Sequence, residues 1–266
     1  MGREPHADAV GLRGMEAKRR SSSSSHARIA LYGGTFDPVH DGHMAVAREL
    51  LKLFALDEVL FIPAHVAPHK RRRVAPASPL HRYAMLALAT QSEARFRVST
   101  VELDEPEKPY TVETIARLKD ALPGARFLFV MGADSWEEIA TWREWERLLA
   151  LVAHVVVTRP GYDLPTGHVT NEARGRIVDL RRGAASGARD GRAIELTGEP
   201  KIYFTDAVKM EIASSDIRRA VREAGEEPVG SIGVPQPVAE YIKKYRLYRE
   251  AHETERHNAG RGRGHD

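Results

Sequence analysis

The hydrophobic positions along this chain follow two periodicities. Short apolar runs rich in β-branched and aromatic residues are typical of buried strands. Between them, apolar residues recur every three to four positions, as on one face of a helix. Strands that alternate with crossover helices predict an α/β domain with a doubly wound, mostly parallel sheet, helices on both faces and further helices at the C-terminal end. We expect strands at residues 29–32, 58–62, 96–101, 126–131, 154–158 and 202–204, and helices at 44–54, 79–90, 111–122, 214–224 and 237–245.

Three segments depart from this rhythm. Residues 1–27 are polar and include a basic triplet and a run of serines, and residues 249–266 are similarly polar. Neither end has enough apolar surface to offset the entropy of ordering, so we expect disordered extensions around a single domain at residues 28–248. Within that domain, residues 161–200 are rich in arginine and glycine and predict a long mobile connection.

Composition narrows the class of protein. The chain has 266 residues and a formal net charge of only +3, which does not imply a nucleic-acid partner. It contains no cysteine, so disulfides and thiolate catalysis are excluded. The N-terminal residues contain no apolar run of the length expected for a signal peptide, and the sequence has no run of about 20 apolar residues that could cross a membrane. We expect a cytoplasmic protein without a membrane partner, and its oligomeric state, including a homo-oligomer, stays open.

The first expected strand runs directly into the string GGTFDPVHDGH, residues 33–43, and then into an amphipathic helix. A glycine turn between a parallel strand and a helix start is a place where backbone amides bind phosphate. Gly33 and Gly34 let the backbone approach a ligand closely, and His40 and His43 can direct imidazole donors at phosphate oxygens. Two histidines could instead bind a metal, but their spacing is not i, i+4 and no third ligand is evident, so we expect no metal site.

Residues 33–43 resemble the nucleotide-binding signature of the nucleotidylyltransferase superfamily, whose HxGH element is shared with class I aminoacyl-tRNA synthetases. The resemblance extends over residues 28–248 and implies a Rossmann-like fold. This sequence departs from the family at residues 212–218, IASSDIR, where the family pattern resembles ISSTxIR. A hydroxyl is lost at Ala213 and kept at Ser215. The further motifs occur in the order found in bacterial nicotinate mononucleotide adenylyltransferases: PHK at 68–70, PYT at 109–111, GADS at 132–135, TW at 141–142, RPG at 159–161 and IASSDIR at 212–218.

The resemblance implies an ATP site in which His40, His43 and Arg218 are catalytic, because they would stabilise the charge that develops as pyrophosphate leaves. Asp134 would hold a ribose, although a carboxylate there could also cap the following helix. The segment from Ser214 to Arg218 could likewise be an ordinary helix start with a surface arginine. The residues implied to bind ATP are Gly33, Gly34, Thr35, Phe36, His40, His43, Gly132, Asp134, Ser214, Ser215 and Arg218.

The resemblance also implies an acceptor site formed by Lys70, Tyr110, Thr111 and Trp142. Backbone N–H groups at Tyr110 and Thr111 would meet a pyridine carboxylate, and Trp142 would stack on the ring. Such donors pair poorly with an amide, which favours nicotinate over nicotinamide. Two alternatives stay open: Lys70 belongs to a solvated run of cations, and Trp142 is one of three clustered tryptophans, of which at least one belongs to the core.

Together, the residues and the resemblance predict an enzyme of NAD biosynthesis that transfers AMP from ATP to nicotinate mononucleotide, giving nicotinate adenine dinucleotide and pyrophosphate. Mg²⁺ would enter bound to ATP. One alternative is another nucleotidylyltransferase, with nicotinamide mononucleotide or phosphopantetheine as acceptor. The other is a nucleotide-binding or RNA-binding module that does not catalyse.

Overall fold

The computed structural model describes residues 27–65, 76–105, 107, 109–181, 193–197, 199–208, 212–224 and 233–249. Seven strands of this part form one sheet in the order β3-β2-β1-β4-β5-β7-β6, and every neighbouring pair is parallel. The order reverses between β1 and β4, which places a ligand crevice beyond their carboxyl ends. The strands are β1 (Arg28–Gly34), β2 (Glu58–Pro63), β3 (Phe96–Val98), β4 (Arg126–Gly132), β5 (Ala153–Val157), β6 (Ile177–Asp179) and β7 (Ile202–Thr205).

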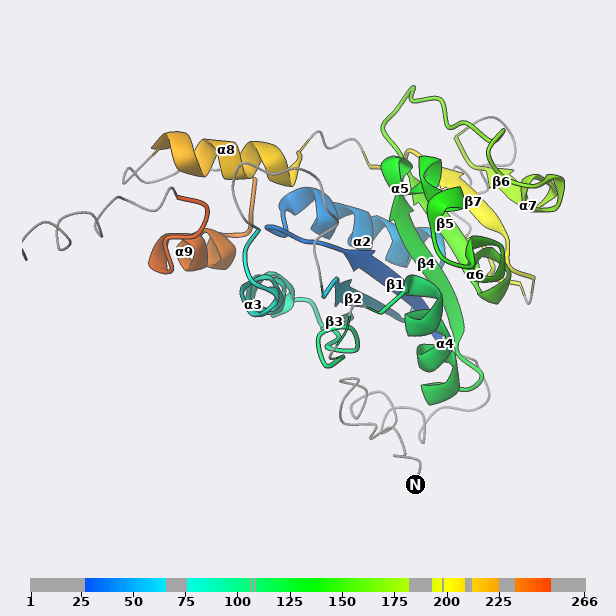
Figure 1. Cartoon of the computed structure of the whole chain (residues 1–266), viewed down its shortest axis with the longest axis horizontal. Helices are drawn as coiled ribbons and strands as arrows, with labels where there is room; N and C mark the ends of the chain where they lie inside the picture. The colour runs from blue at the N-terminus through cyan, green and yellow to red at the C-terminus, as the bar shows by residue number, and fades with distance from the viewer. Residues whose placement is uncertain are drawn as a thin grey trace, which may run out of the picture.

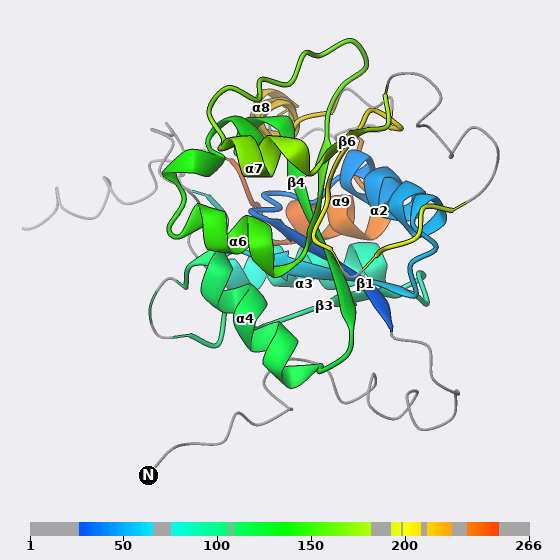
Figure 2. The ribbon, with the colours of Figure 1, turned by 90° about the vertical axis from the view of Figure 1, so that its right-hand side faces the viewer.

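Helices cover both faces of this sheet. Figure 1 shows α3, α8 and α9 toward one side of the molecule, and α4 to α7 toward the other. In the turned view of Figure 2, the strands run between α4, α6 and α7 on the left and α2 on the right. The helices are α2 (Asp41–Leu53), α3 (Pro79–Thr90), α4 (Thr111–Ala121), α5 (Ala133–Glu137), the 3₁₀ turn η2 (Ile139–Thr141), α6 (Trp145–Leu151), α7 (Asn171–Gly175), α8 (Ser214–Ala224) and α9 (Gln236–Lys244).

The two faces of the sheet bury two separate sets of apolar side chains, because successive residues of a strand point in opposite directions. In β1, Ala30 belongs to a core that includes residues of α2, α3, α8 and α9, whereas Ile29 and Leu31 belong to a core that includes residues of α4 and α6. In β4, Leu128 joins the first core and Phe129 the second. Burial on both faces explains why the strands read as nearly continuous apolar runs, and it confirms the predicted doubly wound α/β architecture.

Residues 161–200, predicted as a long mobile connection, contain two short elements that the sequence did not predict. This stretch contains helix α7, whose first turn is capped by the Thr170 hydroxyl accepting from the Ala173 N–H at 3.3 Å. It also contains the edge strand β6, which pairs with β7. Elements of three and five residues carry too little periodicity to be detected in a sequence. Residues 182–192 and 198, like 1–26 and 250–266, lie outside the described residues, so the predicted mobility and terminal disorder stay predictions.

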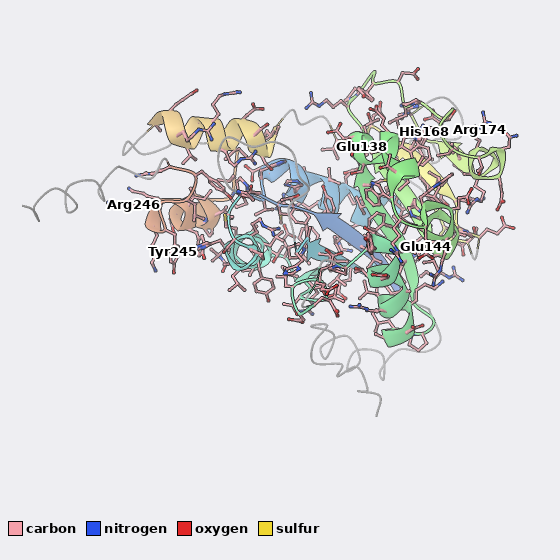
Figure 3. All side chains as sticks on the ribbon, viewed as in Figure 1. Glu138, Glu144, His168, Arg174, Tyr245 and Arg246 are labelled. Atoms are coloured by element: carbon pink, nitrogen blue, oxygen red, sulfur yellow. The ribbon has the colours of Figure 1, made fainter. Side chains whose placement is uncertain are left out.

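Along the described ranges, no helix combines the length and the apolar character needed to cross a membrane. Figure 3 places Glu138 and His168 near α5, and Tyr245 and Arg246 beside α9 at the opposite end.

A buried histidine in β5 predicts acid sensitivity of the fold. His154 is fully buried, with its ring edge-on to Phe129 at 5.7 Å. Burial lowers its pKa from 6.5 to about 3, outweighing the opposite effect of the Val152 backbone. Between these two values only the unfolded chain binds the proton. The unfolding free energy should therefore fall as the pH drops below 6.5, by about 1.4 kcal/mol per pH unit for this group.

Urea unfolding of the wild type and of His154→Leu, near pH 7 and near pH 5, checks this expectation. The variant should lose less stability than the wild type on acidification. Part of the dependence should persist, since burial lowers the pKa of His40 and His43 as well. Equal losses in the two proteins would show that His154 does not titrate in this way.

Candidate active site

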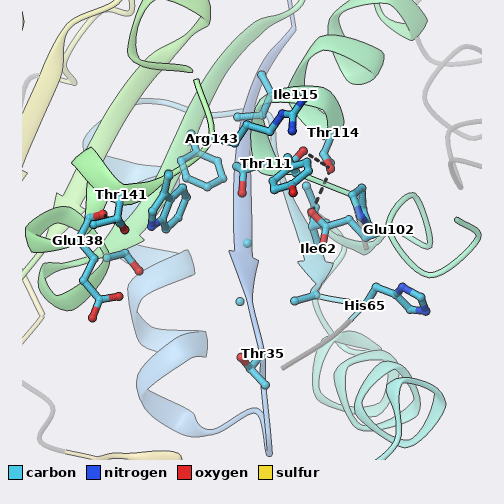
Figure 4. Close-up of a pocket in the computed structure, with 18 of the residues that line it drawn as sticks. Thr35, Ile62, His65, Glu102, Thr111, Thr114, Ile115, Glu138, Thr141 and Arg143 are labelled. Carbon is cyan, nitrogen blue, oxygen red and sulfur yellow. Dashed lines mark hydrogen bonds between the residues drawn. The ribbon is translucent and has the colours of Figure 1, made fainter. Parts of the chain in front are cut away.

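A cavity of about 500 Å³ opens where the carboxyl ends of β1, β2 and β4 meet, at the reversal of strand order. This is the size of pocket that binds small ligands. In Figure 4, Glu138 and Thr141 lie on one side of it, and Thr111 and Ile115 on the other. The lining residues are Gly33, Gly34, Thr35, Ile62, Ala64, His65, Glu102, Pro109, Tyr110, Thr111, Thr114, Ile115, Phe129, Asp134, Ser135, Glu138, Thr141, Trp142 and Arg143.

The predicted acceptor residues Tyr110, Thr111 and Trp142 all line this cavity, and Lys70 lies outside the described residues. Tyr110 is the N-cap of α4, and its N–H donates to the Glu113 carboxylate at 3.1 Å. Because the first amides of a helix have no intrahelical acceptor, the start of α4 at Thr111 presents backbone donors and a positive dipole end at the cavity wall. Such a wall favours an anionic group.

The cluster of tryptophans is divided between the core and the cavity. Trp136 is fully buried, and its indole N–H donates to the Pro165 carbonyl at 2.7 Å. Trp142 is partly buried: one part of it packs against the core that contains Trp136, and another lines the cavity. Trp145 packs against the same core but does not line the cavity. The core role considered for these residues therefore belongs above all to Trp136.

Sequence reasoning missed several residues of the cavity wall. The Arg143 guanidinium lies 4.7 Å above the Tyr110 ring, so the two side chains connect opposite walls. Glu102 accepts a hydrogen bond from the Thr114 hydroxyl at 3.1 Å, drawn as a dashed line in Figure 4. Arg143 and Glu102 do not belong to a recognisable motif. Only the tertiary structure brings them to the cavity.

His40 and His43 form a stacked pair where the turn after β1 enters α2. Their ring centroids are 3.6 Å apart, and the His40 N–H donates to Nδ1 of His43 at 3.2 Å. Burial lowers the pKa of His40 to about 4, and burial together with His40 keeps the pKa of His43 well below 6.5. Both imidazoles are therefore neutral near pH 7. Since Nδ1 of His43 accepts, the proton of that ring is on Nε2, which is a hydrogen-bond donor.

Gly34 and Gly42 lie where a larger residue would collide with neighbouring aromatic rings. A Cβ on Gly42 would lie 3.0 Å from the His40 imidazole, which folds back over the first turn of α2. A Cβ on Gly34 would lie 3.0 Å from the ring of Phe36, whose backbone has the left-handed φ of 49°. That ring is buried edge-on against His43, at 5.0 Å between centroids. Both glycines thus allow the histidine pair to occupy its position.

The start of α8 is packed against the turn that carries the histidines. The Ser214 hydroxyl donates to the Pro38 carbonyl at 3.0 Å. Nη1 of Arg218 donates to the backbone carbonyl of Asp37 at 2.5 Å and lies 3.7 Å from Oδ2 of the Asp37 carboxylate. The Arg218 side chain is only 15% exposed, which excludes the surface-arginine alternative. Phosphate binding by this segment stays a prediction.

The predicted ATP residues thus fall into three sets. Gly33, Gly34, Thr35 and Asp134 line the cavity, with Asp134 in the first turn of α5. The second set lies in or against the turn between β1 and α2 and does not line the cavity. The third set is exposed to solvent. The second set is Phe36, His40, His43, Ser214 and Arg218, and the third is Gly132 and Ser215. Within the described part of the chain, no group of three or more histidine, aspartate or glutamate side chains is placed to hold a metal ion.

The doubly wound sheet and the cavity at its strand-order reversal indicate a nucleotidylyltransferase. Comparison with known families gives the same class of protein. Residues 31–220 match the family model described as cytidylyltransferase-like. A Corynebacterium glutamicum protein named "Probable nicotinate-nucleotide adenylyltransferase" is 36% identical over 224 residues, covering 84% of this chain and 89% of the relative. A Symbiobacterium thermophilum protein of the same name is 39% identical over 223 residues, covering 84% and 95%. The chain therefore belongs to the nicotinate-nucleotide adenylyltransferase family within the cytidylyltransferase-like proteins.

Solved structures share the fold. A structure of Plasmodium falciparum nicotinic acid mononucleotide adenylyltransferase complexed with NaAD superposes with a TM-score of 0.61, at 20% identity, over 84% of this chain and 98% of that one. The same enzyme complexed with APC gives a TM-score of 0.60 at 19% identity. Likeness at this level of identity confirms the Rossmann-like fold.

Proposed function

We propose that this protein transfers the AMP part of Mg-ATP to nicotinate mononucleotide, giving nicotinate adenine dinucleotide and pyrophosphate. The observation that carries the proposal is the cavity at the strand-order reversal. It unites Tyr110, Thr111 and Trp142 with the glycine turn at Gly33 and Gly34. The relatives that bear the corresponding name support it. Mass spectrometry of the products formed from ATP and nicotinate mononucleotide should show nicotinate adenine dinucleotide.

The chemistry needs no covalent enzyme intermediate. A phosphate oxygen of the acceptor attacks the α-phosphorus of ATP, the bond from that phosphorus to the bridging oxygen breaks, and the electron pair leaves with pyrophosphate. The acceptor phosphate is already ionised at neutral pH, since its second pKa is about 6. The protein therefore has to position the reactants and stabilise charge rather than remove a proton. Neutral His40 and His43 supply N–H donors for that charge.

Magnesium enters this scheme as part of the substrate. The Asp37 carboxylate, close to the histidine pair, is occupied by the Tyr248 hydroxyl at 2.8 Å and the Ala77 N–H at 3.1 Å. Mg²⁺ commonly keeps several waters and binds through substrate phosphates. A site of neutral imidazoles and backbone donors is suited to receive Mg-ATP as a complex.

Replacing Trp142 by alanine should raise the KM for nicotinate mononucleotide about five-fold or more, because stacking on an aromatic side chain contributes about 1–3 kcal/mol. The KM for ATP should change little. Initial-rate kinetics with each substrate varied in turn measure both constants.

Trp145→Ala is the matched control, since Trp145 packs against the same core outside the cavity. It should destabilise the protein without changing the KM for the acceptor. Equal effects of the two substitutions on that KM would remove Trp142 from the acceptor site.

A further inference from the structure

A buried arginine lies directly behind the cavity wall and has no part in the chemistry above. Arg82 is in α3, and only 1% of its surface is exposed. Its guanidinium donates to four backbone carbonyls in three separate segments of the chain. The acceptors are Thr35 at 2.7 Å, Ala64 at 2.6 Å, His65 at 3.3 Å and Ala77 at 3.2 Å.

Three of these acceptors belong to residues that line the cavity. Thr35 follows β1, in the turn proposed to hold ATP, whereas Ala64 and His65 follow β2. Figure 4 shows Thr35 and His65 at the same end of the cavity, on different segments. A single guanidinium therefore joins the turns after two neighbouring strands without itself lining the cavity.

The fourth acceptor adds an indirect link to the turn after β1, at Asp37 near its histidines. The Ala77 carbonyl accepts from Arg82, and the Ala77 N–H donates to the Asp37 carboxylate. Asp37 in turn pairs with Arg218. Displacing Arg82 would release constraints on both turns at once.

Arginine is the side chain suited to this task. Its five donors have a fixed planar geometry and can satisfy carbonyls in several directions, whereas the lysine ammonium is a point charge with three donors. Buried carbonyls that lose their donors carry a desolvation cost, so the turns would be expected to shift until they find other partners.

We propose that Arg82 is a positioning residue that sets the separation between the turn after β1 and the turn after β2, and so aligns the two reactants. The inference rests on the proposed function. It predicts an effect on turnover rather than on binding: each substrate keeps its own contacts, but a displacement of about 1 Å between reacting groups costs about 10²-fold in rate.

The test compares R82K and R82Q with the wild type and with R126K. Arg126 also donates to a backbone carbonyl, that of Leu196 at 2.7 Å, but lies at the amino end of β4, away from the cavity. For R82K, kcat per folded molecule should fall about 10²-fold while both KM values stay within about three-fold. R126K should keep the wild-type kcat. Urea titration gives the folded fraction of each protein.

Hydrogen exchange of the full chain without substrates gives a readout independent of the reaction. Exchange at residues 35–36 and 64–65 should accelerate in R82K and not in R126K. An inactive wild type would count against the proposed function, and this exchange pattern would still decide the role of Arg82. Folded R82K with unchanged kcat and exchange, a kcat loss shared by R126K, or failure of both Arg82 variants to fold would overturn the proposal and leave Arg82 a role in stability alone.

Discussion

Replacing His43 by alanine is expected to lower kcat about 10²–10³-fold, because one preorganised donor to developing charge contributes roughly 3 kcal/mol. Nδ1 of His43 is occupied by the His40 N–H, so the donor is Nε2–H. Burial and His40 keep the pKa of this ring well below 6.5. The donor therefore acts as a neutral dipole, and its contribution should not vary between about pH 7 and pH 8. Steady-state kinetics with saturating Mg-ATP and acceptor measure the loss.

His81→Ala is the matched control for that prediction. His81 lies in α3, where its Nδ1 is bonded to the Tyr241 hydroxyl at 2.9 Å, and it does not line the cavity. Its removal should leave kcat near the wild-type value. A His43→Ala enzyme with undiminished kcat would exclude His43 from the chemistry. The backbone amides and Arg218 would then have to stabilise the developing charge.

Replacing Asp37 by alanine is expected to lower the unfolding free energy by about 3–5 kcal/mol, as removal of one partner from a buried ion pair does. Only 1% of Asp37 is exposed. Its carboxylate accepts from Tyr248 and the Ala77 N–H and lies beside Arg218, so its loss leaves buried donors without this acceptor. Urea unfolding at constant pH measures the change.

Asp57→Ala provides the comparison for Asp37. Asp57 also pairs with an arginine, Arg28, at 3.5 Å, but its side chain is 53% exposed. A solvent-exposed pair of this kind contributes at most about 1 kcal/mol. If the two alanine variants lost equal stability, the buried carboxylate would not hold the turn in the way that its contacts indicate.

The sequence predicted those elements best that have both periodicity and end signals. Residues 79–90 were expected as a helix and form α3 with the same bounds, because Ser78 accepts from the His81 N–H and Pro79 begins the first turn. Residues 214–224 likewise form α8. The short elements α5, α7 and β6 were missed, since each has five residues or fewer and carries too little periodicity.

The candidate site divides along similar lines. Tyr110, Thr111 and Trp142 belong to local motifs, and the fold brings them to one cavity. Arg82 and Arg143 have no motif. The importance of Arg82 depends on contacts with Thr35 and Ala64, which are 47 and 18 residues away in the sequence, and only the packing of α3 against two strand ends creates them.

The central claim, transfer of AMP to a nicotinate acceptor, is tested most directly by pyrophosphate release from Mg-ATP with three acceptors in parallel: nicotinate mononucleotide, nicotinamide mononucleotide and phosphopantetheine. The account predicts rapid release with the first, and a kcat/KM at least about ten-fold lower with the second, because the donors at the start of α4 pair poorly with an amide. Phosphopantetheine should give no release. Release with either of the other acceptors but not with nicotinate mononucleotide, or with none of the three, would contradict it.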